Sequence, residues 1–296
     1  MGRKGEPKGN EGENPKGVGD ADRGTARKTG NTNREEGCNM DRKLRIGITE
    51  RGDAGLDLSW THRLSAMDGA ILITKNLNDR FRQALSDAAQ TKPVILHAGC
   101  TGWGGSALEP RVPRYDETLA RLDAIVGDGT LPLSRCVLRI DPIVPTPEGL
   151  GAVRKVLDGM LACGNLQGIR VRISVLDEYR HVKERLRSRG WASFYPGDAF
   201  QASPEQFATV QALLDEYHDR HGVVFETCAE PALTGDAVLR TGCVSAVDLT
   251  EMGLPVPDTG TNPQGRGGCL CLSCKTELLT CRAQCPHGCL YCYWKS

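Results

Sequence analysis

Short apolar runs alternate with longer amphipathic stretches between residues 44 and 228. Each run is rich in β-branched residues and is bounded by polar residues, glycine or proline, which is typical of strands buried in a parallel sheet. Six such runs occur, at residues 44–49, 69–74, 92–99, 136–143, 169–176 and 222–228. We therefore expect six strands in this part of the chain.

The stretches between these runs carry apolar residues at three- and four-residue spacing, which predicts amphipathic helices. The clearest lie at residues 79–90, 116–127, 147–163 and 203–221, and weaker patterns cover 59–67 and 177–189. Ser203 and Pro204 stand where an N-cap and a first helical proline are favoured, so a helix is expected to begin there.

Six strands that alternate with helices make six β–α units. Right-handed crossovers would curl such units into an α/β fold, a partial (β/α)6 TIM-like barrel. A doubly wound sheet is the alternative, and the pattern alone leaves it open. After Cys228 the periodicity fades, and a segment rich in glycine, proline and cysteine runs to the end.

The chain therefore divides into three predicted parts. Residues 1–40 contain almost no large apolar residue, so we expect a disordered tail. Residues 41–230 would form the partial barrel. Residues 231–296 would form a cysteine-rich segment that closes the barrel mouth.

Charge and hydropathy narrow the function classes. Lysine and arginine number 37 and equal aspartate and glutamate at 37, so overall charge predicts neither a nucleic-acid nor a membrane partner. No apolar run approaches the roughly 18 residues of a membrane span, and the start of the chain lacks the apolar region of a secretory signal. We expect a cytoplasmic protein with no membrane partner.

Cysteine is concentrated at the end of the chain. Of 13 cysteines, nine fall at or after Cys228 and seven lie between Cys269 and Cys292. In a reducing compartment, clustered cysteines are more often metal ligands than disulfides. The last three, Cys285, Cys289 and Cys292, have the spacing C-x3-C-x2-C, which supplies three thiolates to a 4Fe–4S cluster and leaves one iron open. Zinc favours paired C-x2-C knuckles, so it fits this spacing less well.

The triplet "CPHGCLYC" has an aromatic residue, Tyr291, before its last cysteine. It resembles the cluster motif of the radical S-adenosylmethionine superfamily, whose fold is a partial (β/α)6 barrel. The resemblance implies that Cys285, Cys289 and Cys292 bind a 4Fe–4S cluster whose open iron holds S-adenosylmethionine, and that Tyr291 contacts the nucleoside. His287, inside the triplet, is interpreted as a loop-forming residue.

In most of that superfamily the triplet follows the first strand, whereas here it ends the chain. The sequence is most similar to a smaller group that carries the triplet at the C-terminus, which indicates a permuted arrangement. The shared motifs include "TKN" at 74–76, "R-x-DPI" at 139–143, "ETCAE" at 226–230 and the pair Cys269 and Cys271. The resemblance implies cofactor-binding roles for Arg139, Glu226 and Asn76.

Four further cysteines correspond to cysteines of that group, namely Cys228, Cys243, Cys269 and Cys271. They are predicted to hold a second 4Fe–4S cluster. Cys274 and Cys281 are additional candidates, and a zinc knuckle that uses Cys271 and Cys274 is the alternative. Cys136 and Cys163 are expected to act as small buried apolar residues.

Polar residues recur where the predicted strands end, and these ends face the active site in barrel enzymes. The candidates are Arg51, Asp53, Thr74, Lys75, Asn76, His97, Arg139, Asp141, Ser174, Asp177, Glu226 and Glu230. Catalytic roles are expected among Arg139, Asp141, Glu226, His97 and Lys75. If the terminal triplet folds back over the barrel mouth, Cys289 should lie near Arg139 and Glu226.

Together these features predict a radical S-adenosylmethionine enzyme that forms the 5′-deoxyadenosyl radical. The resemblance extends to virus-encoded enzymes, and it implies an isomerase that rearranges an amino-acid-modified thymidine in DNA. The expected partners are a small-molecule, nucleoside or DNA substrate and an electron donor such as flavodoxin or ferredoxin. Two alternatives remain, a zinc- or Fe–S-binding nucleic-acid-binding protein and an electron-transfer protein without radical chemistry.

Overall fold

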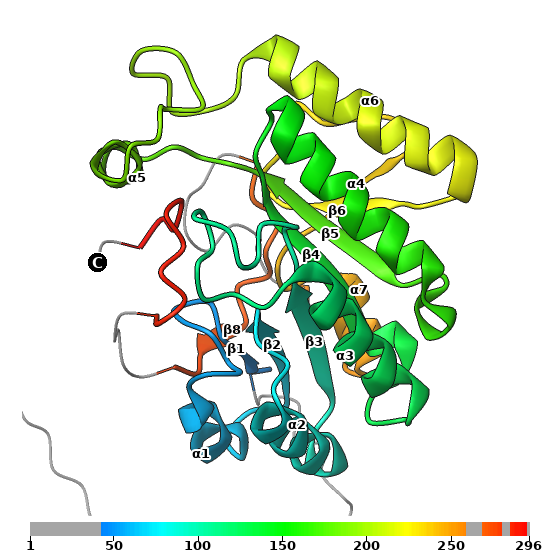
Figure 1. The fold of residues 1–296 in the computed structure, drawn as a ribbon. Helices are drawn as coiled ribbons and strands as arrows, with labels where there is room; N and C mark the ends of the chain where they lie inside the picture. The colour runs from blue at the N-terminus through cyan, green and yellow to red at the C-terminus, as the bar shows by residue number, and fades with distance from the viewer. Residues whose placement is uncertain (1–42, 259–267, 280–284, 295–296) are drawn as a thin grey trace, which may run out of the picture. The chain divides into compact units, whose positions relative to one another are not determined.

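The structure, a computed structural model, describes residues 43–258, 268–279 and 285–294. The strands of this part of the chain form one sheet in the order β7-β6-β5-β4-β3-β2-β1-β8, and every pairing is parallel (Figure 1). They are β1 (Ile46–Ile48), β2 (Gly69–Thr74), β3 (Val94–Gly99), β4 (Cys136–Ile143), β5 (Arg170–Val175), β6 (Phe225–Thr227), β7 (Val238–Arg240) and β8 (Lys275–Glu277).

The helices are α1 (Thr61–Leu64), α2 (Asp79–Thr91), α3 (Tyr115–Gly127), α4 (Pro147–Ala162), α5 (Arg180–Ser188), α6 (Pro204–His221) and α7 (Ala246–Glu251). Local chemistry sets several of their ends. The side chains of Asn78 and Thr146 cap α2 and α4. Ser203 forms a capping box with Gln206 at the start of α6, and Gly222 ends that helix with a left-handed φ of 67°.

Strands β1 to β6 are neighbours in the order in which they occur in the chain. A doubly wound sheet reverses its strand order at a switch point, so this order excludes that alternative. The predicted partial TIM-like α/β fold is confirmed. Two short strands, β7 and β8, extend the sheet at its two edges, and neither they nor α7 were predicted.

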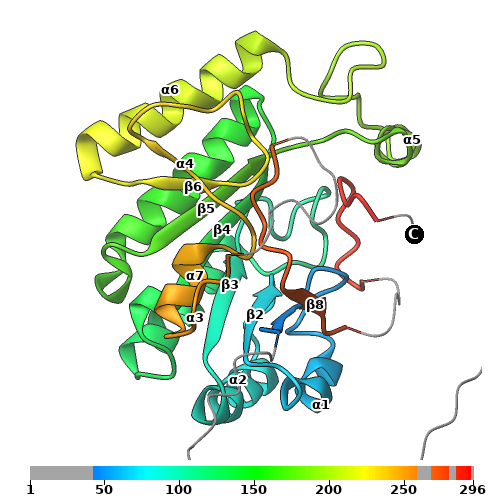
Figure 2. The same ribbon diagram turned by 180° about the vertical axis from the view of Figure 1, so that it is seen from behind.

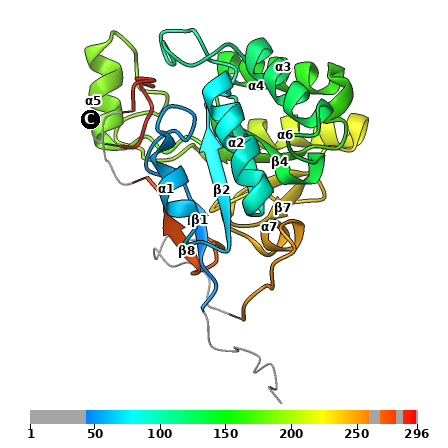
Figure 3. The ribbon, with the colours of Figure 1, turned by 90° about the horizontal axis from the view of Figure 1, so that it is seen from below.

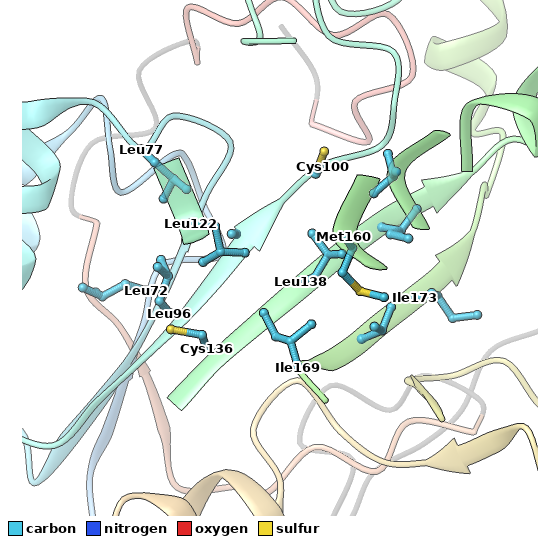
Figure 4. Close-up of a cluster of buried hydrophobic side chains, with 14 of the residues drawn as sticks. Leu72, Leu77, Leu96, Cys100, Leu122, Cys136, Leu138, Met160, Ile169 and Ile173 are labelled. Atoms are coloured by element: carbon cyan, nitrogen blue, oxygen red, sulfur yellow. The ribbon is translucent and has the colours of Figure 1, made fainter. Parts of the chain in front are cut away.

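Alternate residues of each strand face opposite sides of the sheet. Leu72, Leu96 and Leu138 pack with α2, α3, α4 and α6 in the larger apolar cluster (Figure 4). Cys136 belongs to this cluster and is fully buried, as expected. Their neighbours Ile71, Ile95 and Val137 pack on the other face with Leu249 and Met252, so α7 covers the opposite side of the sheet (Figure 2).

The predicted tail, residues 1–40, lies outside the described residues. Residues Lys43–Ser296 form one compact unit. The division at residue 230 stays a prediction, but β8 from the predicted cysteine-rich segment pairs with β1 from the predicted barrel. None of the helices in the described ranges has the length and hydropathy needed to cross a membrane.

Candidate functional site

The last described residues, 285–294, form what we call the terminal loop, which carries Cys285, Cys289 and Cys292. It lies beside α5 and the segment between β3 and α3 (Figures 1 and 3). Arg185 of α5 donates to the carbonyls of Leu290, Cys292 and Trp294, at 3.1, 2.8 and 2.9 Å. The Leu290 amide donates to the Leu108 carbonyl at 2.9 Å. These bonds hold the terminal loop on segments that follow β3 and β5.

His287 ties the terminal loop to the carboxyl end of β1. Its Nε2 lies 2.8 Å from Asp53 Oδ2, and its Nδ1 lies 3.1 Å from the Arg111 carbonyl oxygen. Asp53 also accepts hydrogen bonds from Thr74 Oγ1 at 2.6 Å and from the Lys75 amide at 2.7 Å. His287 therefore does more than shape the loop, because it links the cysteine triplet to the ends of β1 and β2.

Lys75, Glu109 and Tyr291 form a second link to the terminal loop. Lys75 Nζ lies 2.5 Å from Glu109 Oε1 and 2.7 Å from the Tyr291 hydroxyl, which also hydrogen bonds to Glu109. Glu109 is fully buried, and Thr101 Oγ1 donates to its other oxygen at 2.6 Å. Burial lowers the pKa of Lys75, but Glu109 and Cys289 outweigh it, so the pKa is raised and the side chain stays charged.

The triplet thiols sit in this charged surrounding. Burial raises the pKa of Cys289 to about 12, and the nearby Lys75 opposes that effect. Burial also raises the pKa of Cys285. All three thiols are half-buried, so they are neither sealed in the core nor spread on the surface. Lys75 supplies a positive charge next to the thiolate that a metal would require at Cys289.

A polar patch lies on β4 and β5, on the face of the sheet opposite to helices α2, α3, α4 and α6. Arg139 and Asp141 form an ion pair at 2.5 Å, and Ser174 hydrogen bonds to the same carboxylate. The Arg139 side chain keeps 16% of its surface exposed and the Asp141 side chain keeps 26%, so a ligand can contact this pair. The Asp141 carboxylate also contributes to the raised pKa of Lys75, after Glu109 and Cys289.

Deeper on the same face lies a buried ionic layer. Glu226 accepts hydrogen bonds from Arg170 Nε at 2.6 Å and Arg172 Nε at 2.9 Å. Asp248 of α7 accepts from Arg170 at 2.8 Å. His97 is fully buried at 3.4 Å from both Arg139 and Arg172. Burial and then these guanidinium groups lower its pKa well below the ordinary value, so the ring is neutral.

A second cysteine group lies where the two edges of the sheet approach each other. Cys228 follows β6, Cys243 follows β7 and Cys271 precedes β8; we call them the seam cysteines. Among the described residues they form a group whose sulfur atoms all lie within 4.8 Å of one another. The hydrogen bonds that the three thiols share lower the pKa of Cys271 and raise that of Cys228, so the group favours one thiolate, at Cys271. This group is a candidate metal site.

The structure thus divides the predicted site residues between two places. Cys285, Cys289, Tyr291, Lys75 and Asp141 lie at the terminal loop or next to it. On the other side of Arg139 lie Glu226, His97 and the seam cysteines. The Arg139 guanidinium contacts one of these cysteines, Cys243, at a distance of 3.8 Å from its Sγ. Glu226 forms its ion pairs with Arg170 and Arg172. The approach of Cys289 to Arg139 and Glu226 stays a prediction.

Two predicted ligands and one predicted cofactor contact are not members of the two cysteine groups. Cys269 is buried but does not belong to the seam group. Cys274 is buried in the apolar cluster that contains Ile71, Ile95 and Val137. Asn76 accepts a hydrogen bond from Asn78, the residue that caps α2. Cys281 lies outside the described residues.

Sequence reasoning missed Glu109 and Asp248, the two acids with fully buried side chains in the ion pairs described here. Glu109 lies in the segment between β3 and α3, where no periodic pattern singles it out. Asp248 is part of the capping box of α7 and follows Ser245 by three residues. That spacing is the one local signal that would have drawn attention to it.

The fold and site together define a parallel α/β protein with one cysteine group on a terminal loop and a second at its sheet edges. The chain belongs to the family described as "Domain of unknown function (DUF1848)", whose model matches residues 59–294. A comparison with curated proteins found no match.

Proposed function

We propose that this protein is a radical S-adenosylmethionine enzyme and that the terminal loop holds its catalytic iron–sulfur cluster. The observation that carries the proposal is the placement of the C-x3-C-x2-C triplet. The terminal loop is bonded to Asp53, Lys75 and Glu109, which follow β1, β2 and β3. Barrel enzymes build their active sites at these carboxyl ends.

The donor set fits a 4Fe–4S cluster. Three half-buried thiols come from one short loop, and Gly288 adopts a left-handed φ of 67° between the first two. The sulfur atoms of the triplet do not all lie within 4.8 Å of one another, whereas those of the seam cysteines do. Wider spacing suits thiolates that each bind a different iron. When bound, the cluster would supply one electron that breaks the sulfonium C5′–S bond of S-adenosylmethionine into methionine and a 5′-deoxyadenosyl radical, which would remove a hydrogen atom from the substrate.

The chain's own residues would bind and orient the cofactor. S-adenosylmethionine carries an ammonium and a carboxylate, and the half-buried ion pair of Arg139 and Asp141 offers one partner of each opposite charge. Tyr291 is the aromatic residue expected against the nucleoside, and its hydroxyl is fixed by Lys75 and Glu109. These buried contacts limit the motion of the ring and exclude water from one side of the triplet.

The substrate is the finer part of the proposal. The rearrangement of an amino-acid-modified thymidine rests on the sequence resemblance, and a flavodoxin- or ferredoxin-type protein is the proposed electron donor. Modified thymidine, free and within DNA, should be offered as substrate to the reduced enzyme. A product that requires S-adenosylmethionine would support the isomerase, whereas cofactor cleavage without a product would restrict the proposal to the radical class.

The test of the class is the release of 5′-deoxyadenosine. The anaerobically purified full chain, reduced with dithionite in the presence of S-adenosylmethionine, should release 5′-deoxyadenosine. Cys289→Ala should abolish that release, because the cluster loses a ligand. Cys163→Ser is the matched control, since Cys163 lies at the end of α4 and is not part of either cysteine group. Colourless protein without iron, or iron without cofactor cleavage, would favour the nucleic-acid-binding or electron-transfer alternatives.

A further inference from the structure

The seam cysteines come from three separate segments, yet their sulfur atoms meet. Cys228 Sγ lies 3.8 Å from Cys271 Sγ, and all three sulfur atoms lie within 4.8 Å of one another. A disulfide needs a separation of about 2.05 Å, so the close approach is not a covalent pair. Three thiols brought together from three segments point to a shared ligand.

Groups that favour anionic sulfur lie next to two of the three thiols, those of Cys271 and Cys243. The Cys243 amide donates to Cys271 Sγ at 3.1 Å. Both terminal nitrogens of Arg139 lie 3.8 Å from Cys243 Sγ. Arg172 donates to the Cys243 carbonyl at 3.3 Å. Donors aimed at sulfur stabilise the thiolate form, which is the form that binds metal.

The distances distinguish one metal ion from a cubane cluster. Tetrahedral zinc binds thiolates at about 2.3 Å, which places two sulfur ligands about 3.8 Å apart. The separation of Cys228 and Cys271 is 3.8 Å. In a cubane each thiolate binds a different iron and points away from the centre, so the thiolates lie further apart than around a single ion. The separation of the seam cysteines therefore favours a single ion over the second cluster that the sequence predicts.

We propose that Cys228, Cys243 and Cys271 bind a single zinc-class divalent ion through three thiolates. This ion is distinct from the iron of the terminal loop, and the proposal does not depend on radical chemistry. Its position indicates what the ion does. Strands β7 and β8 are the two edges of the sheet. Cys243 follows one edge, and Cys271 precedes the other.

The backbone around the seam cysteines is built for this closure. The Leu272 amide donates to the Val244 carbonyl at 2.9 Å, so the two segments already run side by side. Gly242 permits their approach, because a Cβ there would lie 2.6 Å from the Cys271 Cα. A bound ion would join the ends of β6 and β7 to the segment that leads into β8. Its binding free energy would then contribute to folding.

The test isolates the seam cysteines within the full-length chain. The triple variant Cys285→Ala/Cys289→Ala/Cys292→Ala removes the terminal ligands. Titration with Co²⁺ should give one equivalent of bound cobalt with the intense visible absorption of tetrahedral thiolate coordination. Adding Cys271→Ser should abolish that absorption, whereas adding Cys163→Ser should leave it unchanged. Cobalt absorption that persists without Cys271, or no cobalt binding at all, overturns the proposal.

A second titration addresses the cluster directly. The same triple variant, supplied with iron and sulfide, should not form a cluster at the seam cysteines. Uptake of about four irons, with an absorbance at about 400 nm that Cys271→Ser abolishes, would assign a cubane cluster to the seam cysteines and overturn the single-ion site.

A measurement on the unmodified protein covers the case in which the variants fail to fold. X-ray absorption at the zinc edge should show sulfur neighbours at about 2.3 Å. One zinc per chain with such a shell supports the site, and a purified chain without zinc contradicts it. Failure of 5′-deoxyadenosine release would leave this result standing, so the two proposals fail separately.

Discussion

The terminal loop and the seam cysteines present three thiols each, but they are built in opposite ways. The terminal loop takes its thiols from eight consecutive residues, Cys285 to Cys292, and depends on Arg185, His287 and Tyr291 for its attachment. The seam cysteines come from three segments and meet only when β6, β7 and β8 are in place. The thiols of the terminal loop are close in sequence, and the loop is attached to the barrel by hydrogen bonds. The seam cysteines are distant in sequence, and the folded sheet brings them together.

This difference predicts different consequences for stability. The seam cysteines adjoin the ionic layer that contains Arg172 and Glu226, so damage there should lower the stability of the whole domain. The terminal loop packs on segments that follow the strands and is not part of the sheet, so damage there should act locally and affect metal retention first. The predictions below run from the largest expected effect to the smallest.

Glu226→Gln should have the largest effect. Arg172 is 1% exposed, and the substitution removes a carboxylate that it shares with Arg170. An incompletely compensated buried charge costs about 3 kcal/mol, which urea denaturation would measure. Glu216→Gln is the matched control, because its pair with Arg154 lies at the surface and should contribute little. Equal stability of the two variants would remove the distinction between core and surface ion pairs.

Gly242→Ala should separate the two segments of the seam. The added methyl would lie 2.6 Å from the Cys271 backbone, so one segment must shift at a cost of about 2 kcal/mol. Zinc content should fall while the iron of the terminal loop is retained. Gly151→Ala is the control, because a Cβ there meets no atom within 4 Å. Loss of iron before zinc would reverse the comparison.

The buried His97 should make the barrel sensitive to acid. Its pKa in the folded state is lowered, so the unfolded chain binds a proton that the folded chain excludes. The contribution of His97 to stability is therefore complete above the ordinary pKa of about 6.5 and is lost as the pH falls below that value. His97→Gln should flatten this part of the curve of unfolding free energy against pH. His62→Gln, on the exposed face of α1, should leave the curve unchanged.

Arg185→Ala should act locally and have the smallest effect on global stability. It removes three hydrogen bonds to carbonyls of the terminal loop, at a cost of about 1 kcal/mol. Limited proteolysis should show faster cleavage near residue 290, and iron should be lost faster than zinc. Arg187→Ala on the exposed face of α5 is the control. A large fall in the denaturation midpoint would show that the terminal loop is part of the cooperative core.

The sequence was sufficient for the parts of the fold that repeat. Strand β2 at Gly69–Thr74 and strand β4 at Cys136–Ile143 begin and end where their apolar runs do. Helix α6 follows its predicted cap, Ser203, because the capping box acts within four residues. Strands β7 and β8 have three residues each and no apolar periodicity, so their pairing with β6 and β1 depends on tertiary contacts that no local pattern records.

The same limit applies to the two cysteine groups. Spacing alone identifies Cys285, Cys289 and Cys292, because one short loop brings them together. Cys228 and Cys243 are separated from Cys271 by 43 and 28 residues, so only the folded sheet edges define their distances. The predicted partner Cys269 is not a member of that group, although it is only two residues from Cys271. Glu109 was missed because its partners Lys75 and Tyr291 are 34 and 182 residues away in the sequence.

The most direct test of the central claim is the electron paramagnetic resonance spectrum of the reduced, anaerobic full-length chain, recorded before and after addition of S-adenosylmethionine. If the terminal triplet holds a cluster with an open iron, the cluster signal should change shape when the cofactor binds. Cys289→Ala should lack this response, and Cys163→Ser should retain it. A cluster signal that S-adenosylmethionine does not alter, or reduced protein without a cluster signal, would contradict the account.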